Sequence, residues 1–430
     1  MRCDVAAHPS NRPITQENIA STEFWQLLDG ETQEALEIVA PVLPFRTNSY
    51  VLSRLIDWDS APDDPIYRLT FPHRDMLEPS EYERLRDVRR RGSPAEFALA
   101  VTEARAHLNP NSQGQSTLNV PLLDGRRMAG VQHKYHETAL LFPAAGQTCF
   151  TNCTYCFRWA QFVGDPDLLF AAPDTSELVE YLRRTPEVTD VLVTGGDPMT
   201  MSARRLQDYI EPLLAPDLEH VQNIRIGTKA PASYPLRFFA EEDSDDLLRL
   251  LERVAKVRSL ALMVHISHPV ELSTLEAEEA IERLRNTGAV IRTQAPVLRH
   301  INDDPAVWAE LWSSAVRLGI TPYYMFVGRD TGAKAYFELP LVKVHEIYQE
   351  AYSKVTGLAR SVRGPVMSAT PGKVRVLGVQ EVDGERVFVL DYLQARDPSL
   401  VRRPFFARYD PEATWFDQLR PLEGDEFRLL

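Results

Sequence analysis

The sequence predicts an α/β protein centred on a partial (β/α)6 TIM-type barrel, with a helical region before it and a C-terminal extension with a β-hairpin after it. Six short apolar runs alternate with amphipathic segments between Ala139 and Phe326. Such alternation implies a parallel sheet with right-handed crossovers, and six units fit an incomplete barrel better than a full eight-fold one. Further along, two apolar runs flank Asp383-Gly384, a pair that favours a type I′ turn and hence a hairpin.

The region before the predicted barrel is expected to be helical. Residues 1–20 are polar, and we expect a flexible N-terminus there. Residues 21–135 form the helical N-terminal region, with a break at DWDSAPDDP and a polar loop at NPNSQGQST. The basic run within ERLRDVRRRG is typical of a solvated helix face.

The predicted barrel occupies residues 136–345. Its strands are expected at TALLFP, DVLVT, NIRIG, LALMVHI, AVIRT and YYMF. The segments between them carry apolar residues at helical spacing, as in SELVEYLRR, DDLLRLLERV, LEAEEAIERLRNTG and VWAELWSSAVRLG. Ser273 and Glu276 form a capping box that would begin one of these helices, and Gly288 is placed to end it.

Residues 346–430 form the expected C-terminal region. A helical stretch gives way to KVRVLGVQEVDGERVFVLDY, which contains the predicted hairpin. The final stretch, RRPFFARYDPEATWFDQLRPLEGDEFRLL, is aromatic and mixed in charge. It would pack over the barrel or onto another subunit, and the sequence leaves both arrangements open.

Composition and charge narrow the class of protein. The chain has 430 residues, of which 44% are hydrophobic and 25% charged, which is ordinary for a soluble globular protein. Its net charge of −14 disfavours binding to nucleic acid or to an anionic membrane. No apolar span approaches the roughly 20 residues that cross a bilayer, and the N-terminus lacks the apolar core of a signal peptide. We therefore expect a cytoplasmic protein whose cysteines stay reduced.

Three of the four cysteines lie in one short stretch, QTCFTNCTYCFRWAQF. Cys149, Cys153 and Cys156 follow the first predicted barrel strand, so they lie at its C-terminal end, where the active sites of such barrels collect. Thiolates suit zinc or an iron–sulfur cluster. Structural zinc takes four protein ligands, and Cys3 is remote, so a zinc site would need a histidine. A [4Fe-4S] cluster on three cysteines leaves one iron open to a reactant.

The spacing C-x3-C-x2-C resembles the signature of the radical S-adenosylmethionine (SAM) enzymes. This resemblance implies that the open iron binds SAM, whose cleavage yields a 5′-deoxyadenosyl radical, and that the barrel is of the radical SAM type. A second motif, TGGDP, ends the second predicted strand with Gly195, Gly196 and Asp197. It resembles the GGD element of the same superfamily, which implies that these residues approach the methionine end of SAM.

Most of the chain, from about Phe24 to Lys373, resembles the lysine 2,3-aminomutase family. The matching segments, in the right order, are LPFRTNSYVLSRLID, IRIGTKAPASYPLR, HISHPVE, QAPVLRHIND and PYYMFVGRD. The resemblance implies an isomerase that uses pyridoxal phosphate (PLP) together with the cluster and SAM. In that family the adenosyl radical removes a hydrogen from the substrate β-carbon, and the α-amino group then moves to that carbon.

The family resemblance implies roles for individual residues of this chain. Lys373, in SATPGK, matches the lysine that holds PLP covalently. Arg158, two residues after the last cysteine, matches the arginine that binds the substrate carboxylate. Gln294 and His265 match residues beside the cofactors, and Lys134 stands in for one of two phosphate-binding arginines.

The chain also departs from the family at positions that contact the substrate or PLP. Ala369 stands where lysine-specific members have an aspartate, and Arg329 aligns with the second such aspartate, with Asp330 one place away. Thr138 replaces the other phosphate-binding arginine, and Phe326 replaces a tyrosine near PLP. We expect Arg329 and Asp330 to contact the substrate. Because an arginine repels a lysine side chain and pairs with a carboxylate, we expect an acidic or polar amino acid rather than lysine.

Three hypotheses follow. The first is a radical SAM 2,3-aminomutase with a [4Fe-4S] cluster, SAM and PLP. The second is a radical SAM enzyme that has lost or repurposed PLP and abstracts hydrogen from another small amine or acid. The third is a non-catalytic iron–sulfur or zinc module. For the first two we expect a small-molecule amino acid or acid substrate, an electron donor such as flavodoxin or ferredoxin, and a homo-oligomer as is common in the family.

Overall fold

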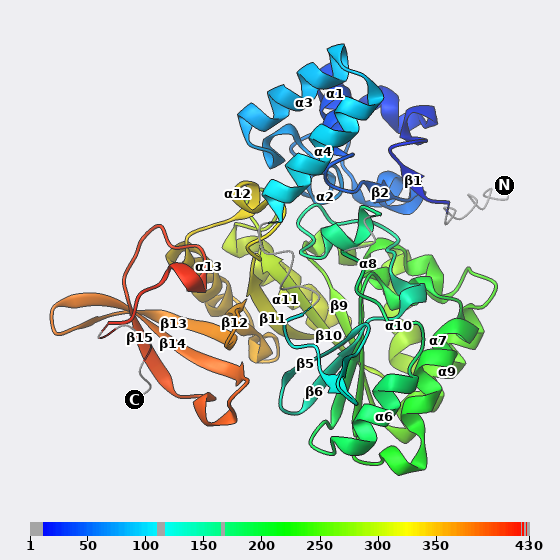
Figure 1. Cartoon of the computed structure of the whole chain (residues 1–430), viewed down its shortest axis with the longest axis vertical. Coiled ribbons are helices and arrows are strands. Elements are labelled where there is room, and N and C mark those ends of the chain that lie inside the picture. The colour runs from blue at the N-terminus through cyan, green and yellow to red at the C-terminus, as the bar shows by residue number, and fades with distance from the viewer. Residues whose placement is uncertain (1–11, 110–116, 165–167, 423, 425–426, 428–430) are drawn as a thin grey trace.

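The computed structural model describes residues 12–430 apart from 110–116, 165–167, 423, 425–426 and 428–430. Its central feature is an 11-stranded sheet with the strand order β15-β14-β13-β12-β11-β10-β9-β8-β7-β6-β5. Neighbouring strands from β6 to β12 run parallel, and the strands at both ends of the sheet run antiparallel. Helices follow the parallel strands, so the chain is an α/β fold with a large mixed sheet (Figure 1).

The parallel strands follow one another in chain order. They are β6 (Thr138–Leu141), β7 (Asp190–Val193), β8 (Asn223–Thr228), β9 (Ser259–His265), β10 (Val290–Val297), β11 (Thr321–Val327) and β12 (Arg363–Ser368). The longer helices between them are α6 (Ser176–Arg184), α7 (Ala203–Ile210), α9 (Ser244–Val257), α10 (Leu275–Asn286), α11 (Pro305–Arg317) and α13 (Leu341–Ser353). Two short helices, α8 (Ala230–Ser233) and α12 (Lys334–Phe337), lie in loops after β8 and β11.

The six strands predicted from the sequence are confirmed as β6 to β11. The parallel strand β12 was not predicted, because its sequence RGPVMS contains Gly364 and Pro365, which weaken a strand pattern. The predicted capping box at Ser273 is wrong by one residue. A 3-10 helix, Pro269–Leu272, ends just before Ser273, and the Ser273 hydroxyl donates to Val270 O of that helix. The N-cap of α10 is therefore Thr274, whose hydroxyl accepts from the N–H of Ala277.

The N-terminal helices form their own layer, seen at the top of Figure 1. They are α1 (Gly30–Val39), α2 (Pro65–Thr70), α3 (Pro79–Arg91) and α4 (Pro94–Leu108). β1 (Ile14–Thr15), before these helices, pairs with β2 (Arg46–Thr47), which lies between α1 and α2, and Ile19 is buried. Arg89 and Arg90 of the basic run on α3 form ion pairs with Glu37 and Glu34 of α1. None of the helices in the described part of the chain is long and apolar enough to cross a membrane.

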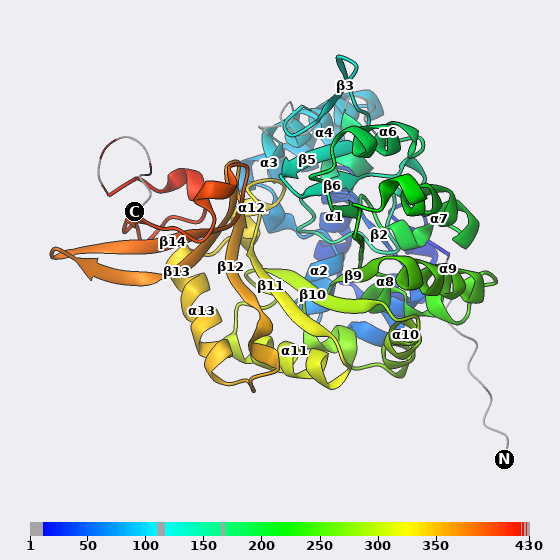
Figure 2. The same cartoon turned by 90° about the horizontal axis from the view of Figure 1, so that it is seen from below.

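Antiparallel strands extend the sheet on both sides. A small hairpin, β3 (Leu122–Leu123) and β4 (Arg126–Arg127), precedes β5 (Val131–Tyr135), which pairs with β6. At the other side, β13 (Gly372–Val382) and β14 (Glu385–Ala395) form the predicted hairpin, and β15 (Pro404–Arg408) covers its edge. Asp383 and Gly384 at its tip have φ of 51° and 83°, as a type I′ turn requires. The hairpin projects away from the helices (Figure 2).

Candidate active site

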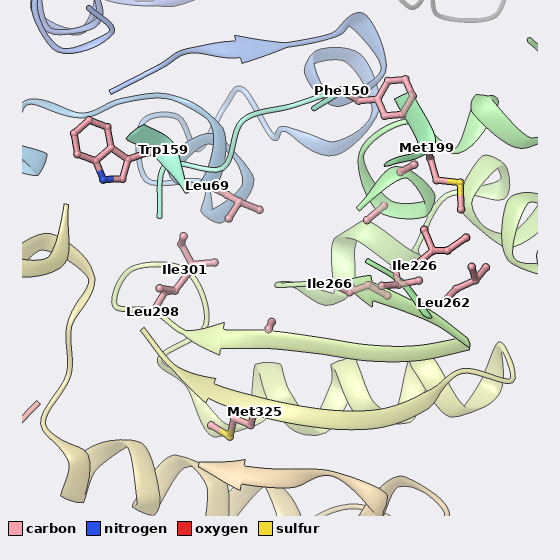
Figure 3. Close-up of a cluster of buried hydrophobic side chains, with 14 of the residues drawn as sticks. Leu69, Phe150, Trp159, Met199, Ile226, Leu262, Ile266, Leu298, Ile301 and Met325 are labelled. Atoms are coloured by element: carbon pink, nitrogen blue, oxygen red, sulfur yellow. The ribbon is translucent and has the colours of Figure 1, made fainter. Parts of the chain in front are cut away.

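The three clustered cysteines lie in the loop after β6, at its C-terminal end, and all three are free thiols. Phe150, between Cys149 and Cys153, and Trp159, after Cys156, are buried and anchor this loop in the hydrophobic core (Figure 3). Phe150 stacks on Tyr234 with ring centroids 5.0 Å apart, and the Trp159 indole donates to Thr331 Oγ1 at 3.2 Å. The loop is therefore fixed at both ends.

The N-terminal region holds the middle of the cysteine loop. The backbone N–H of Asn152 donates to Arg46 O at 2.8 Å, and that of Thr154 donates to Leu69 O at 2.9 Å. Asn48 donates from its amide to Phe150 O at 3.2 Å. Because these donors and acceptors are buried, each unmade bond would be costly. The helical region thus shapes the loop that carries the cysteines, a role that the sequence did not indicate.

The donor set fits an iron–sulfur cluster. Burial raises the pKa of all three thiols, that of Cys153 to about 12, and the charge of Cys156 further raises the pKa of Cys149 and Cys153. Thiolates near enough for their charges to interact need positive charge, which the iron of a bound cluster would supply. Among the described residues, no group of three or more His, Cys, Asp or Glu side chains is arranged around a single metal ion.

The TGGDP motif lies directly against the start of the cysteine loop. A Cβ on Gly196 would lie 2.3 Å from Thr148 O and 2.4 Å from Thr148 N, and a Cβ on Gly195 would lie 2.3 Å from Gln147 Nε2. Asp197 donates its backbone N–H to Thr148 O at 2.6 Å. Its carboxylate accepts from Thr228 Oγ1 and from the N–H groups of residues 199 and 229, so Asp197 joins the ends of β7 and β8.

Replacing Gly196 with alanine should displace the cysteine loop, because the added methyl group meets backbone atoms that cannot rotate away. We expect a reconstituted G196A protein to bind less than about half of the four irons of a cubane, measured as iron and sulfide per chain. G357A is the matched control, since a Cβ there meets nothing within 4 Å. Equal iron contents in the two variants would contradict this tight packing.

A second group of polar side chains comes from β9, from β10 and from the segments that follow β8 and β9. Lys229 forms a buried ion pair with Glu271, and Lys229 also lowers the pKa of Cys153. The side chains of His265 and Gln294 are joined at 2.9 Å between Nε2 atoms. Burial and the Lys229 charge lower the pKa of His265 to about 4, so this ring is neutral at physiological pH. Of these residues, Lys229 and Glu271 were not singled out from the sequence.

Arg158 is a buried cation without an acidic partner among the described residues. Its Nη2 donates to Gln147 Oε1 at 3.2 Å, and its Cζ lies 4.2 Å from the Phe142 ring centroid. Its Nε is buried with no hydrogen-bond partner. Burial lowers the pKa of Arg158 to about 10, so it is charged at neutral pH. A buried guanidinium with an unused N–H group suits an anionic ligand.

Lys373 lies at the start of β13, and its amine lies among other cationic side chains, a region here called the lysine pocket. Its Nζ donates to Gln394 Oε1 at 2.7 Å and lies 4.6 Å from the ring centroid of Tyr324. Burial and the charges of Arg225, Lys134 and nearby Arg363 lower the pKa of Lys373 to about 7. An amine that is partly neutral near pH 7 is a good nucleophile toward an aldehyde. Gln394, which pairs with Lys373 across the hairpin, is a site residue that the sequence did not reveal.

The surroundings of Lys373 fit the phosphate of PLP. Lys134 Nζ donates to Ala369 O at 2.6 Å, and burial with the charges of Arg329 and Arg396 lowers its pKa to about 7. A phosphate dianion would relieve the repulsion among these cations. Thr138, predicted to replace a phosphate-binding arginine, instead donates to Asp190, which is paired with Arg225.

The cysteine loop and the residues around Lys373 come close to each other at Phe157, which directly follows Cys156. The Cζ of Arg329 lies 5.3 Å from the Phe157 ring centroid, and Arg329 is close enough to Lys134 to lower its pKa. Asp330 Oδ1 is 4.0 Å from Arg329 Nε, at the limit of an ion pair. The cysteine loop and the lysine pocket therefore adjoin each other.

Comparison with known proteins gives the family. No family model matches the chain. A "Putative L-lysine 2,3-aminomutase" of Aquifex aeolicus is 32% identical over 409 residues, which cover 95% of this chain and 96% of that protein. The chain belongs to the lysine 2,3-aminomutase family. As a member it is a radical SAM isomerase, and membership implies a [4Fe-4S] cluster, SAM and PLP as cofactors.

Other family members match a shorter part of the chain. The L-lysine 2,3-aminomutase of Fusobacterium nucleatum is 31% identical over 230 residues, 54% of this chain and 51% of that protein. The glutamate 2,3-aminomutase of Clostridioides difficile is 29% identical over 213 residues, 49% of this chain and 47% of that protein. The family thus contains proteins named for a basic and for an acidic amino acid.

Proposed function

We propose that the protein is a 2,3-aminomutase that moves the α-amino group of an amino acid other than lysine to its β-carbon. The observation that carries the proposal is the close approach of the cysteine loop to the pocket of Lys373, through Phe157, Arg329 and Lys134. When bound, the cluster and SAM would supply a 5′-deoxyadenosyl radical, and PLP would supply the electron sink.

The residues of the chain would share the work as follows. Cys149, Cys153 and Cys156 hold the cluster, while Gly195, Gly196 and Asp197 keep the loop in place beside SAM. His265 and Gln294 line the SAM side of the site as a neutral, hydrogen-bonded pair. Lys373 holds PLP, and Lys134 binds its phosphate. Arg158 binds the substrate α-carboxylate, to which its unpartnered Nε can donate.

The side-chain end of the substrate would contact Arg329, with Asp330 beside it. Three cations surround this region, namely Lys134, Arg329 and Arg396, and Arg329 has its nearest carboxylate at 4.0 Å. Net positive charge there favours an acidic or polar side chain and opposes an ammonium group. This is the reason for placing lysine outside the substrate class.

The remaining expectations from the sequence also enter the proposal. The strands β6 to β11 with their helices would form a partial barrel of the radical SAM type within residues 136–345. Residues 21–135 would form the N-terminal region and residues 346–430 the C-terminal region. A flavodoxin or ferredoxin would reduce the cluster, and the enzyme would act in the cytoplasm as a homo-oligomer.

The proposal is tested by anaerobic reconstitution with iron, sulfide, SAM and PLP, followed by reduction in the presence of a panel of amino acids. We expect release of 5′-deoxyadenosine that one class of amino acid stimulates, together with the β-amino isomer of that amino acid. Stimulated release without any β-amino product would favour the alternative, a radical SAM enzyme in which PLP is lost or repurposed. An intact cluster that never cleaves SAM would contradict both.

Changing Arg329 to aspartate should make the pocket more favourable to lysine, because it replaces a repelling charge with an attracting one. We expect R329D to bind L-lysine at least about tenfold more tightly than the unchanged protein, which corresponds to one close charge pair. Equilibrium dialysis of the holoenzyme measures this. R317A, on the far helix α11, is the control. Unchanged lysine affinity in R329D would show that Arg329 lies outside the pocket.

A further inference from the structure

The C-terminal segment, residues 409–419, reaches the candidate active site. Leu341 donates its backbone N–H to Ala413 O at 2.8 Å, and Thr414 Oγ1 donates to Glu338 Oε2 at 2.7 Å. These bonds tie the segment to the chain just after α12, a few residues beyond Arg329. Trp415 is 4% exposed, so its large side chain packs inside the molecule.

Arg329 lies over two aromatic rings from distant parts of the sequence. Its Cζ is 5.3 Å from the ring centroid of Phe157 and 5.9 Å from that of Trp415. Phe157 belongs to the cysteine loop, and it is 44% exposed, close to the 39% of the Arg329 side chain. Both contacts fall within the range of a cation–π interaction.

The charged groups around this contact are of both signs. The cations are Lys134, Arg329 and Arg396, and the charges of the two arginines lower the pKa of Lys134. Asp330 lies 4.0 Å from Arg329 Nε, and burial with the Asp330 charge raises the pKa of Asp417 in the C-terminal segment. Neither acid makes a close, two-pronged pair with Arg329, so the guanidinium keeps N–H groups for a ligand.

We propose that Trp415 and Phe157 position the Arg329 guanidinium to bind the side-chain carboxylate of an acidic amino acid, which makes the C-terminal segment part of the substrate pocket. Aromatic rings attract the face of a guanidinium and leave its edge, where the N–H groups lie, for a carboxylate. The inference rests on the proposed function, since it assumes that Arg329 contacts the substrate. It also gives residues 409–419 a role in choosing the substrate.

The contact has a consequence for how the site is assembled. Phe157 directly follows a predicted cluster ligand, Arg329 follows β11, and Trp415 lies near the C-terminus, so three remote segments meet at one guanidinium. An acidic side chain bound there would rest beside the loop that generates the radical. Trp415 is a positioning residue, because it touches Arg329.

The test measures binding of L-glutamate, L-aspartate and, as a neutral probe, L-leucine to the unreduced holoenzyme by calorimetry. We expect W415L to weaken binding of one of the acidic probes by about tenfold and to leave L-leucine unchanged. W415F should recover most of the loss, because a smaller aromatic ring still attracts the guanidinium. F157L changes an exposed residue and should weaken binding of the same probe. It keeps the proposal testable if the W415L protein does not fold.

A double-mutant cycle separates positioning from general packing. In an R329A background, W415L should cause no further loss of affinity for the acidic probe. The proposal is overturned if W415L weakens the acidic and neutral probes alike, or if its effect is the same in the R329A background. If R329A alone leaves the acidic probes unaffected, the substrate class of the proposed function fails too. If R329A weakens them but neither W415L nor F157L does, only the positioning role fails.

Discussion

Replacing Cys153 with serine is expected to abolish SAM cleavage. Three thiolates hold the candidate cluster, and a serine hydroxyl is a poor iron ligand, so one corner of the cube would lose its protein ligand. We expect iron in the reconstituted variant to fall from about four per chain to below about one, with loss of the visible absorbance of the cluster. Release of 5′-deoxyadenosine after reduction should fall to the level of protein-free solution.

The control is C3S, because Cys3 lies far from the other cysteines in the sequence. Its iron content and SAM cleavage should match those of the unchanged protein. A C153S protein that still cleaves SAM would remove Cys153 from the ligand set. Circular dichroism distinguishes loss of the cluster from loss of the fold, since Cys153 lies in a loop whose backbone is held by residues on either side.

The strands and helices of the predicted barrel region were predictable because their sequences show clear hydrophobic periodicity. Strands β6 to β11 and the helices between them each bury one face, so the sequence repeats the pattern that the sheet needs. The hairpin was predictable from Asp383-Gly384, because two consecutive residues with positive φ need those residue types. β12 was not, because its pairing depends on the neighbouring strand β11 rather than on its own composition.

The candidate site was predictable only where chemistry restricts residue type. The cysteine spacing and TGGDP are local in sequence, and both lie where the strand ends bring them together. Gln394, Glu271 and Trp415 could not be found in this way. Each is an ordinary residue type whose importance comes from a partner more than 20 positions away or from another element, as with Gln394 and Lys373 across the hairpin.

Replacing Lys373 with alanine should abolish covalent attachment of PLP and amino migration while sparing the cluster. Lys373 is the residue that would supply the amine for the covalent link, whereas Lys134 is assigned to the phosphate of PLP. We expect K373A to show no cofactor adduct after borohydride reduction, by mass spectrometry of the peptide that contains position 373. Reduced K373A should still release 5′-deoxyadenosine slowly. K354A removes an exposed lysine and should behave as the unchanged protein.

The pH dependence of PLP attachment gives an independent test of the same residue. Burial and neighbouring cations lower the pKa of Lys373 from 10.5 to about 7, so the neutral, nucleophilic amine predominates above pH 7. The rate of attachment to the PLP-free protein should therefore rise with a midpoint near pH 7. Because the Lys134 charge contributes to the lowering, K134M should move the midpoint to higher pH. A midpoint near that of a free lysine in the unchanged protein would mean that Lys373 is solvated and that burial and neighbouring cations do not lower its pKa.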